Sequence, residues 1–524
     1  MAIESIGTSR SYLTKQLVSL KGNLTEKTSQ LASGKVSQTY GGLGDNRLLD
    51  LELNQKVNRI SSYQETITQV NLHIKSLNVT LERLEDLRLD TKSALDLNDY
   101  ELQNDGQTRT QATAEVLLHE AISLLNTEVA GYYLYGGTDA YENPVADVDS
   151  IMEGSGDRAG LKQVMNEYIA ANLGSDKLGR LEVPALVAPT ASTITITEDG
   201  AHDFGLKLSS VTSDLANASI TQPTGAIPDS LSIEFTGQPD AGQKISIEFT
   251  LPPGHTKPVS FELAADTTGE GVDTFVIGAD TDETAANLRA KILEKIEEQA
   301  NTSLKAAASE WAGDQFFDTF GGATPMRVDG PPFESATALI SGASTTVEWY
   351  VGENTSTTDA RRDKNARVDD NLNVSYGARA NEKGLSDVMK SLATFVAADF
   401  STDVAFTGSE TPEEKKEMLA AQERIDKLHY GEFVQRFRSV VQPDVADQSG
   451  IVDISTEISI AFRTVQDTDS RHTQMKSTYS ATIDEIEGVD KELLAVEILQ
   501  LQTNLEASYR ASSIVFNLNL ADYI

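Results

Sequence analysis

An unbroken ladder of apolar residues between residues 60 and 84 constrains the fold more than any other feature. Its positions alternate spacings of three and four residues: Ile60, Tyr63, Ile67, Val70, Ile74, Leu77, Leu81 and Leu84. Most residues between them are polar or charged. This spacing is typical of a helix that buries one narrow stripe against partner helices. It predicts a helix over about residues 47–97, roughly 75 Å long at 1.5 Å per residue.

Similar ladders occur near both ends of the sequence. The ladder near the N-terminus consists of Leu13, Leu17, Leu20 and Leu24, and Lys27 and Leu31 continue it. The ladder near the C-terminus consists of Leu494, Ile498, Leu501 and Leu505, followed by Ser508, Ser512 and Val515. Another long helix is predicted over 451–486, where Asp469, His472 and Lys476 fall on the apolar seam. We expect the middle of that seam to be less well packed. Both ends must share one bundle for their seams to be covered.

The stretch "LASGKVSQTYGGLGDN" at 31–46 interrupts the helical pattern. Its glycines and small polar residues predict a break between two helices. No comparable glycine-rich run is evident near the other end of the sequence. A third helix is predicted from residue 108 to about 134, because Gly136-Gly137 would end it.

Residues 147–360 differ from the rest of the chain. Short β-branched runs such as "STITITE", "SLSIEFTG", "KISIEFTL", "PVSFELA" and "DTFVIG" predict strands, and "DTDETAANLRAKILEKIEEQ" predicts one amphipathic helix. The predicted fold is therefore mainly α with a β-rich insert: a long antiparallel coiled-coil helical rod formed by both termini, with a variable α+β domain inserted in the middle. The predicted domains are terminal helices at 1–46 plus 487–524, a rod at 47–146 plus 361–486, and the insert at 147–360.

Composition narrows the classes of function. The net charge is −37 with a pI near 4.5, which argues against binding to nucleic-acid phosphates or anionic membrane surfaces. The chain has no cysteine, and its six histidines are scattered without a zinc motif. No apolar run reaches the roughly 18 residues of a membrane helix, and the first residues do not read as a secretory signal. We therefore expect no enzyme activity, no catalytic, cofactor or metal site, and no cofactor.

The helical seams instead favour assembly with other chains. A thin helix with one buried stripe is marginal alone, and the terminal seams are shorter and more interrupted than the one at 60–84. Such helices would become ordered when they pack against neighbouring subunits. They could equally fold back on the rest of the chain, and the pattern alone leaves both interpretations open.

Several stretches resemble the bacterial flagellins and flagellar hook–filament junction proteins. In that family a Leu-Ser-Ser/Thr-Gly-like stretch ends one helix, a polar loop carries an Asp, and a long helix follows. Here Leu31-Ala32-Ser33-Gly34 and Asp45 hold those places, with Ala32 instead of the usual Ser. "AGYYLYGGTDAYENPV" and "NVSYGARANEKGLSDVMKSLATF" are similar to the segments that flank the family's variable domain. "TNLEASYRASSIVFNLNLADYI" resembles the end of the junction group more than that of filament flagellins.

The resemblance implies a structural subunit at the hook–filament junction of an extracellular flagellum, exported without a cleaved signal peptide. It implies as partners other copies in a ring, a neighbouring hook-associated protein, flagellin, and an export chaperone at the C-terminal helix. Leu518, Leu520 and Tyr523 would form a small apolar patch buried against neighbours. The alternatives are a filament flagellin and, from another class, a cytosolic coiled-coil scaffold with a β-rich binding module.

Overall fold

The protein is mainly α-helical and carries several small sheets. The computed structural model describes residues 2–95, 100–103, 106–188, 191–252, 258–269, 271–402, 404–440 and 450–521. Its longer helices are α1 (Ala2–Ser33), α2 (Arg47–Ala94), α3 (Arg109–Leu125), α5 (Leu161–Leu173), α6 (Thr281–Gln299), α7 (Lys305–Phe317), α8 (Lys383–Ala397), α9 (Pro412–Val440), α10 (Ile451–Glu487) and α11 (Lys491–Ala521). Two compact units form: Met1–Asn71 with Ala366–Val374 and Phe462–Ile524, and Leu72–Asn365 with Ser375–Ala461.

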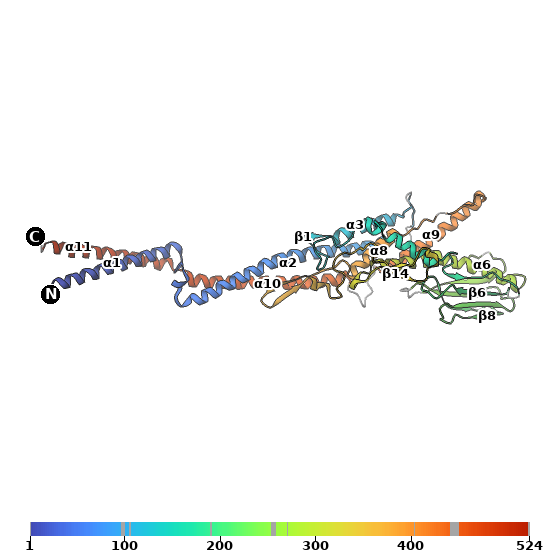
Figure 1. Cartoon of the computed structure of the whole chain (residues 1–524), viewed down its shortest axis with the longest axis horizontal. Coiled ribbons are helices and arrows are strands. Elements are labelled where there is room, and N and C mark those ends of the chain that lie inside the picture. Colours follow the sequence, from blue (N-terminus) through green and yellow to red (C-terminus); the bar gives the residue numbers. More distant parts are fainter. Residues whose placement is uncertain are drawn as a thin grey trace. The chain divides into compact units, whose positions relative to one another are not determined.

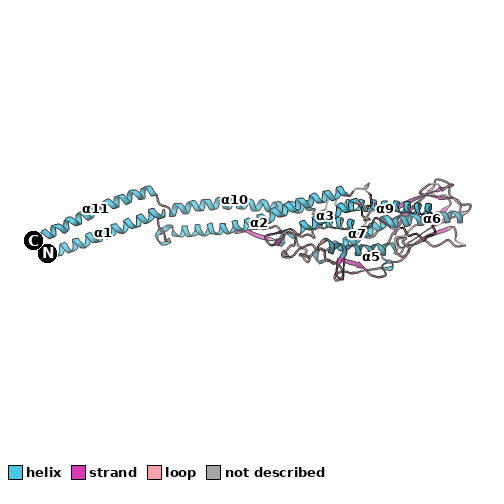
Figure 2. Cartoon of the chain, turned by 90° about the horizontal axis from the view of Figure 1, so that it is seen from above, coloured by secondary structure: helices cyan, strands magenta, loops and turns pink. Residues whose placement is uncertain are grey.

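In the first unit, helices α1 and α11 lie side by side (Figures 1 and 2). The first half of α2 pairs with the second half of α10 in antiparallel fashion, since Gln64 contacts Thr473 at 3.2 Å and the Lys56 ammonium lies over the Tyr479 ring. The tip of the β15–β16 hairpin (Asn365–Asp369 and Leu372–Ser375) packs on this pair. The two ends of the chain therefore pair with each other inside this unit.

The break after α1 is matched by a second break near the other end of the chain, where the sequence pattern separates a helix over 451–486 from a last helix. Helix α10 ends at Glu487 and α11 begins at Lys491. Asp490 caps the new helix, because its carboxylate accepts from the backbone N–H of Glu492 at 3.0 Å.

The middle of the α10 seam differs from expectation at His472, whereas Asp469 and Lys476 are only half-buried, as expected. His472 is almost completely buried, its ring stacks on Tyr63 at 5.7 Å, and its Nε2 lies 3.5 Å from Asp369. The aspartates at the tip of the β15–β16 hairpin supply polar partners for this part of the seam, because Arg471 also pairs with Asp369. Hence His472, in the polar middle, is well packed.

In the second unit, α3 begins with a capping box in which Thr108 and Gln111 satisfy each other's backbone groups. It ends at Leu125, nine residues short of the predicted 134. Ala130 and Gly131 both have positive φ, which suits a two-residue hairpin turn between β1 (Glu128–Val129) and β2 (Tyr132–Tyr133). The β-branched and aromatic residues here thus form a hairpin instead of a last helical turn.

Two four-stranded sheets and α6 share one apolar core (Figure 1). Their orders are β5-β6-β9-β8 and β12-β11-β10-β7, antiparallel except for the β11–β12 pair. The bounds are β5 (Leu181–Glu182), β6 (Thr193–Glu198), β7 (Lys207–Ser213), β8 (Ala218–Thr221), β9 (Ser230–Phe235), β10 (Lys244–Thr250), β11 (Val259–Asp266) and β12 (Thr274–Val276). The five predicted strands are confirmed as β6, β9, β10, β11 and β12, and the predicted helix is α6, capped by Asp280.

Other elements of this unit were not predicted. These are α4 (Val148–Glu153), α5, α7, β7, β8 and the small pairs β3–β4 (Gly154–Ser155, Arg158–Ala159) and β13–β14 (Met326–Val328, Leu339–Ser341). A π-helical stretch at Ala300–Leu304 joins α6 to α7. Helices α3, α5, α7, α8 and α9 pack on one another. Among the helices in the described part of the chain, none combines the length and hydrophobicity that crossing a membrane requires.

Candidate functional site

The predicted seam of α2 is covered almost throughout. Seven of its positions are buried: Ile60, Ile67, Val70, Ile74, Leu77, Leu81 and Leu84. Tyr63 is half-buried, and its hydroxyl lies 3.0 Å from a carboxylate oxygen of Asp370. The three-four spacing therefore identified the packed face of this helix.

The terminal seams face each other but are covered less completely. Leu494 and Ile498 are buried, whereas six positions are only half-buried: Leu13, Leu17, Leu20, Leu24, Leu501 and Leu505. Lys27, which interrupts the α1 ladder, forms a 2.8 Å ion pair with Glu497 of α11. The side chains of Leu518 and Leu520, and Tyr523 as a whole, lie outside the described residues.

Helix α11 also carries apolar residues on its other side, which the sequence analysis missed. Leu493, Val496, Leu499 and Ile514 are 59–63% exposed. At 100° per residue, Val496, Leu499 and Ile514 fall roughly opposite the seam that faces α1. On α1, Tyr12 and Val18 are exposed as well. A plot of all apolar positions around the helix, rather than of the best single ladder, would have found this second face.

The two helix breaks of the first unit form a joint. The Val36 N–H donates to the Glu487 carbonyl at 2.6 Å, and the Val489 N–H donates to the Gly34 carbonyl at 3.2 Å. The Lys35 ammonium pairs with the Glu487 carboxylate, which raises the pKa of Lys35. Backbone pairing and one ion pair thus hold the two breaks together.

Asp50 is the unusual group near this joint. Its side chain is completely buried, and no hydrogen bond within the described residues reaches either carboxylate oxygen. Burial raises the pKa of Asp50, and the Glu487 carboxylate adds to the rise, while the Lys35 ammonium opposes it. Because the folded pKa lies above the unfolded value, protonation favours the folded joint.

We expect Asp50→Asn to stabilise the first unit at neutral pH. Burying the charged Asp50 carboxylate costs stability. This cost is absent below pH 3.8, the pKa of the group in the unfolded chain, and it appears as the pH rises through the higher pKa of the folded state. The difference in thermal midpoint between variant and wild type, followed by circular dichroism, should therefore shrink from pH 7 towards pH 4. Asp45→Asn, at an exposed position of the same break, is the matched control. Equal effects of the two variants at all pH values would contradict this account.

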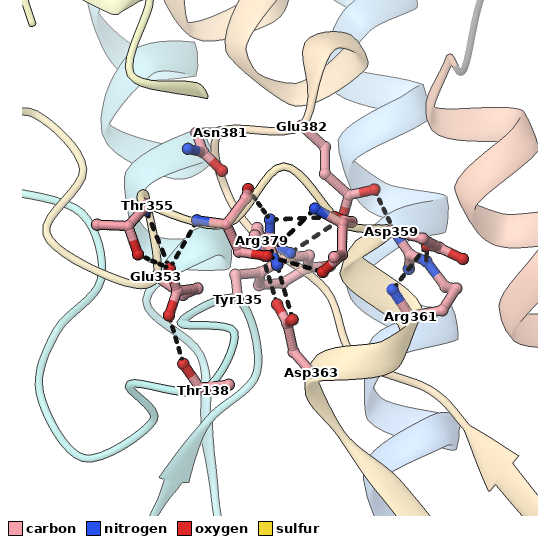
Figure 3. A network of polar contacts seen from close by, with 12 residues as sticks. Tyr135, Thr138, Glu353, Thr355, Asp359, Arg361, Asp363, Arg379, Asn381 and Glu382 are labelled. Atoms are coloured by element: carbon pink, nitrogen blue, oxygen red, sulfur yellow. Dashed lines mark hydrogen bonds and ion pairs between the residues drawn. The ribbon is translucent and has the colours of Figure 1, made fainter. Parts of the chain in front are cut away.

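A buried polar network in the second unit joins residues far apart in sequence (Figure 3). Arg379 is 1% exposed and pairs through two nitrogens with Asp363, with Nη2–Oδ1 at 2.7 Å. Its Nη1 donates to the carbonyls of Ser356 at 2.9 Å and Thr358 at 3.4 Å. One guanidinium therefore fixes the loop that precedes Asp363.

The same network ties the segment around Tyr135 to the segment around Arg379. The Ala380 N–H donates to the Tyr135 carbonyl at 3.0 Å, and the Gly137 N–H donates to the Ala378 carbonyl at 3.1 Å. Burial raises the pKa of Tyr135, whose hydroxyl contacts Thr80 at 2.6 Å. These contacts join the two stretches that flank residues 147–360.

Two carboxylates of the network have opposite surroundings. Hydrogen bonds from the hydroxyls of Thr355 and Thr138 lower the pKa of Glu353 to about 2, so it is ionised at neutral pH. Burial raises the pKa of Glu382, although Arg361 pairs with it. Both act as structural groups, because each is engaged by neighbouring residues of the chain. No trio of metal-ligating side chains converges within the described residues.

No model of a known protein family matches the chain, and no curated protein matches it in sequence.

Proposed function

We propose that this protein is a structural subunit that assembles with copies of itself and with related chains through its terminal helices. The single observation that carries the proposal is the outward face of α11. Val496, Leu499 and Ile514 are more than half exposed on the side opposite the one that packs on α1, and Leu493 is exposed at the flank of the helix. Exposed apolar residues that gather on one face mark interaction surfaces, and α1 adds Tyr12 and Val18.

The finer form of the proposal is a flagellar subunit: an antiparallel coiled-coil rod of both termini, with a variable domain inserted between its halves. The paired α1 and α11 and the matched breaks at 34–36 and 487–489 support it. The hydrogen bonds between residues 135–137 and 378–380 support the insert, because they bring its two flanks together. An insertion whose ends meet adds little strain to the helices that carry it.

Within this class we propose a hook–filament junction protein, on the strength of the resemblance of its last residues. Its partners would be a ring of its own copies, a neighbouring hook-associated protein and flagellin. An export chaperone would cover α11 before assembly, since that helix presents apolar faces on two sides. A filament flagellin remains the alternative, because the same terminal helices would serve either protein.

We expect the purified protein to bind hook or filament fragments in a short, saturable layer. A junction subunit needs two different surfaces, each matched to another protein, so its self-addition stops. Leu499→Asp should abolish or strongly weaken this binding, because it places a charge in the proposed interface. Electron microscopy and sedimentation of the fragments measure the layer.

Gln502→Asp is the matched control, since it introduces the same charge at an exposed polar position of the same helix. Both variants must retain the helical content of the wild type. Equal binding by Leu499→Asp and wild type would contradict assembly through α11. Long filaments of this protein alone, grown from seeds, would instead support the flagellin alternative.

A further inference from the structure

The second unit contains a pocket of about 660 Å³ beside the Arg379 network. The end of α7 and the residues after it contribute Asp314 and Asp318, and helix α8 contributes Asp387. The first turns of α10 contribute Asp453 and Glu457. Together with the loop at residues 357–360, which contributes Asp359, four separate stretches of the chain meet around one acidic cavity.

The positively charged side chains near this pocket do not neutralise all of the acidic side chains that line it. Arg361 pairs with Glu382, Glu457 and Asp359, all of which line the cavity. Lys390 lies 2.6 Å from Asp314 and 3.8 Å from Asp387, and Lys383 also pairs with Asp387. Within the described residues, no ion pair joins Asp318 or Asp453 to a cation. The cavity therefore keeps a negative potential that a cationic ligand would neutralise.

An unused acceptor lies in the wall of the same pocket. Asn381, labelled in Figure 3, is only 4% exposed, and its Nδ2 donates to the Thr319 hydroxyl at 3.3 Å. That bond orients the amide and leaves Oδ1 without a hydrogen-bond partner in the described residues. A buried amide oxygen without a donor is unfavourable, and a ligand N–H would satisfy it.

The remaining lining is apolar. Phe317 and Ile454 are buried, while Phe320 is half exposed and presents its ring to the cavity. Such surfaces suit an alkyl chain, and an aromatic face attracts an ammonium group. A bare metal ion fits poorly, because no three metal-ligating groups converge in the described part of the chain.

We propose that this pocket binds an organic cation that carries primary ammonium groups on an alkyl chain. One ammonium lies among Asp318 and Asp453, and the alkyl chain covers the half-exposed Phe320. Another ammonium donates to Asn381 Oδ1 after the amide turns towards the cavity, because this oxygen is almost inaccessible in the structure. Two sources share this chemistry: a free linear polyamine and the lysine side chains of a peptide segment.

Isothermal titration of the full-length protein with spermidine, 1,5-diaminopentane and tetralysine tests the proposal. We expect one saturable site per chain that persists at physiological ionic strength. Asn381→Leu should weaken binding about tenfold or more, and so should the double variant Asp318→Asn with Asp453→Asn. The control is Glu413→Gln with Glu414→Gln at exposed positions of α9, which removes the same charge far along the sequence from the pocket residues.

The control is essential because a chain of net charge −37 attracts any polycation. Non-saturable binding, or equal weakening by the pocket and control variants, would overturn the proposal. Circular dichroism must show that Asn381→Leu and the double variant are folded, and the two variants serve as independent checks. Tighter binding of tetralysine than of either small amine would identify a peptide as the source. The reverse order would identify a free polyamine, and both results support the ammonium chemistry.

Discussion

Replacing Arg379 by Met should destabilise the second unit by about 3–5 kcal/mol, because it leaves a buried carboxylate without its partner. The side chains of Arg379 and Asp363 are 1% and 5% exposed. The substitution would also remove the donors to the carbonyls of Ser356 and Thr358. Both tryptophans of the chain, Trp311 and Trp349, lie in this unit, so tryptophan fluorescence during denaturant unfolding reports on it alone.

The matched control is Lys244→Met. Its ion pair with Glu262 lies in the same unit, but both side chains are about half exposed, so its loss should hardly move the unfolding midpoint. Combining Arg379→Met with Asp363→Leu removes both buried charges and should recover part of the lost stability. A midpoint for Arg379→Met equal to that of Lys244→Met would contradict a structural role of this pair.

The elements that could be predicted are those in which apolar residues recur at a regular spacing, because such a spacing places them on one buried side of a helix or strand. The ladder at 60–84 and the alternating strands 193–198 and 244–250 each bury the predicted face. The end of α3 could not be placed, because the pattern does not show that Ala130 adopts a positive φ in a hairpin turn. The break between α10 and α11 falls where the helix predicted over 451–486 ends, and "EGVD" marks it: Gly488 ends one helix and Asp490 caps the next.

The candidate sites were less accessible from sequence. A buried arginine has no periodic signal, and Arg379 meets Asp363 through the fold of the intervening hairpin. The acidic pocket combines residues near positions 318, 359, 381 and 453, which only the tertiary structure brings together. The chain has a net charge of −37 and therefore many acidic residues, so its composition could not distinguish the acidic residues of the pocket from the others. The proposals on terminal-helix assembly and on the pocket therefore rest on different grounds, and either can fail alone.

In the free monomer, backbone amides in 13–31 and 494–512 should exchange at least about a hundredfold faster than those in 74–87. A factor of 100 corresponds to about 3 kcal/mol of opening free energy. The difference arises because the two regions are buried to different extents. Most seam positions of α1 and α11 are half-buried, whereas the seam of α2 in this region is buried at Ile74, Leu77, Leu81, Leu84 and Leu87. Within the described residues, α1 and α11 pack on each other, and both helices also carry exposed apolar residues. Hydrogen exchange with mass spectrometry measures both regions in one sample.

Assembly should change only the terminal helices. When copies pack on Leu493, Val496 and Leu499, opening α11 also breaks contacts between subunits, so its amides should slow towards the rate of 74–87. Leu499→Asp should leave the monomer rates nearly unchanged but prevent this slowing, which separates loss of assembly from loss of folding. Slow exchange across both terminal helices in a proven monomer would mean that the α1–α11 pair is stable by itself. The exposed face would then not be needed for order, and the case for assembly-coupled folding would fail.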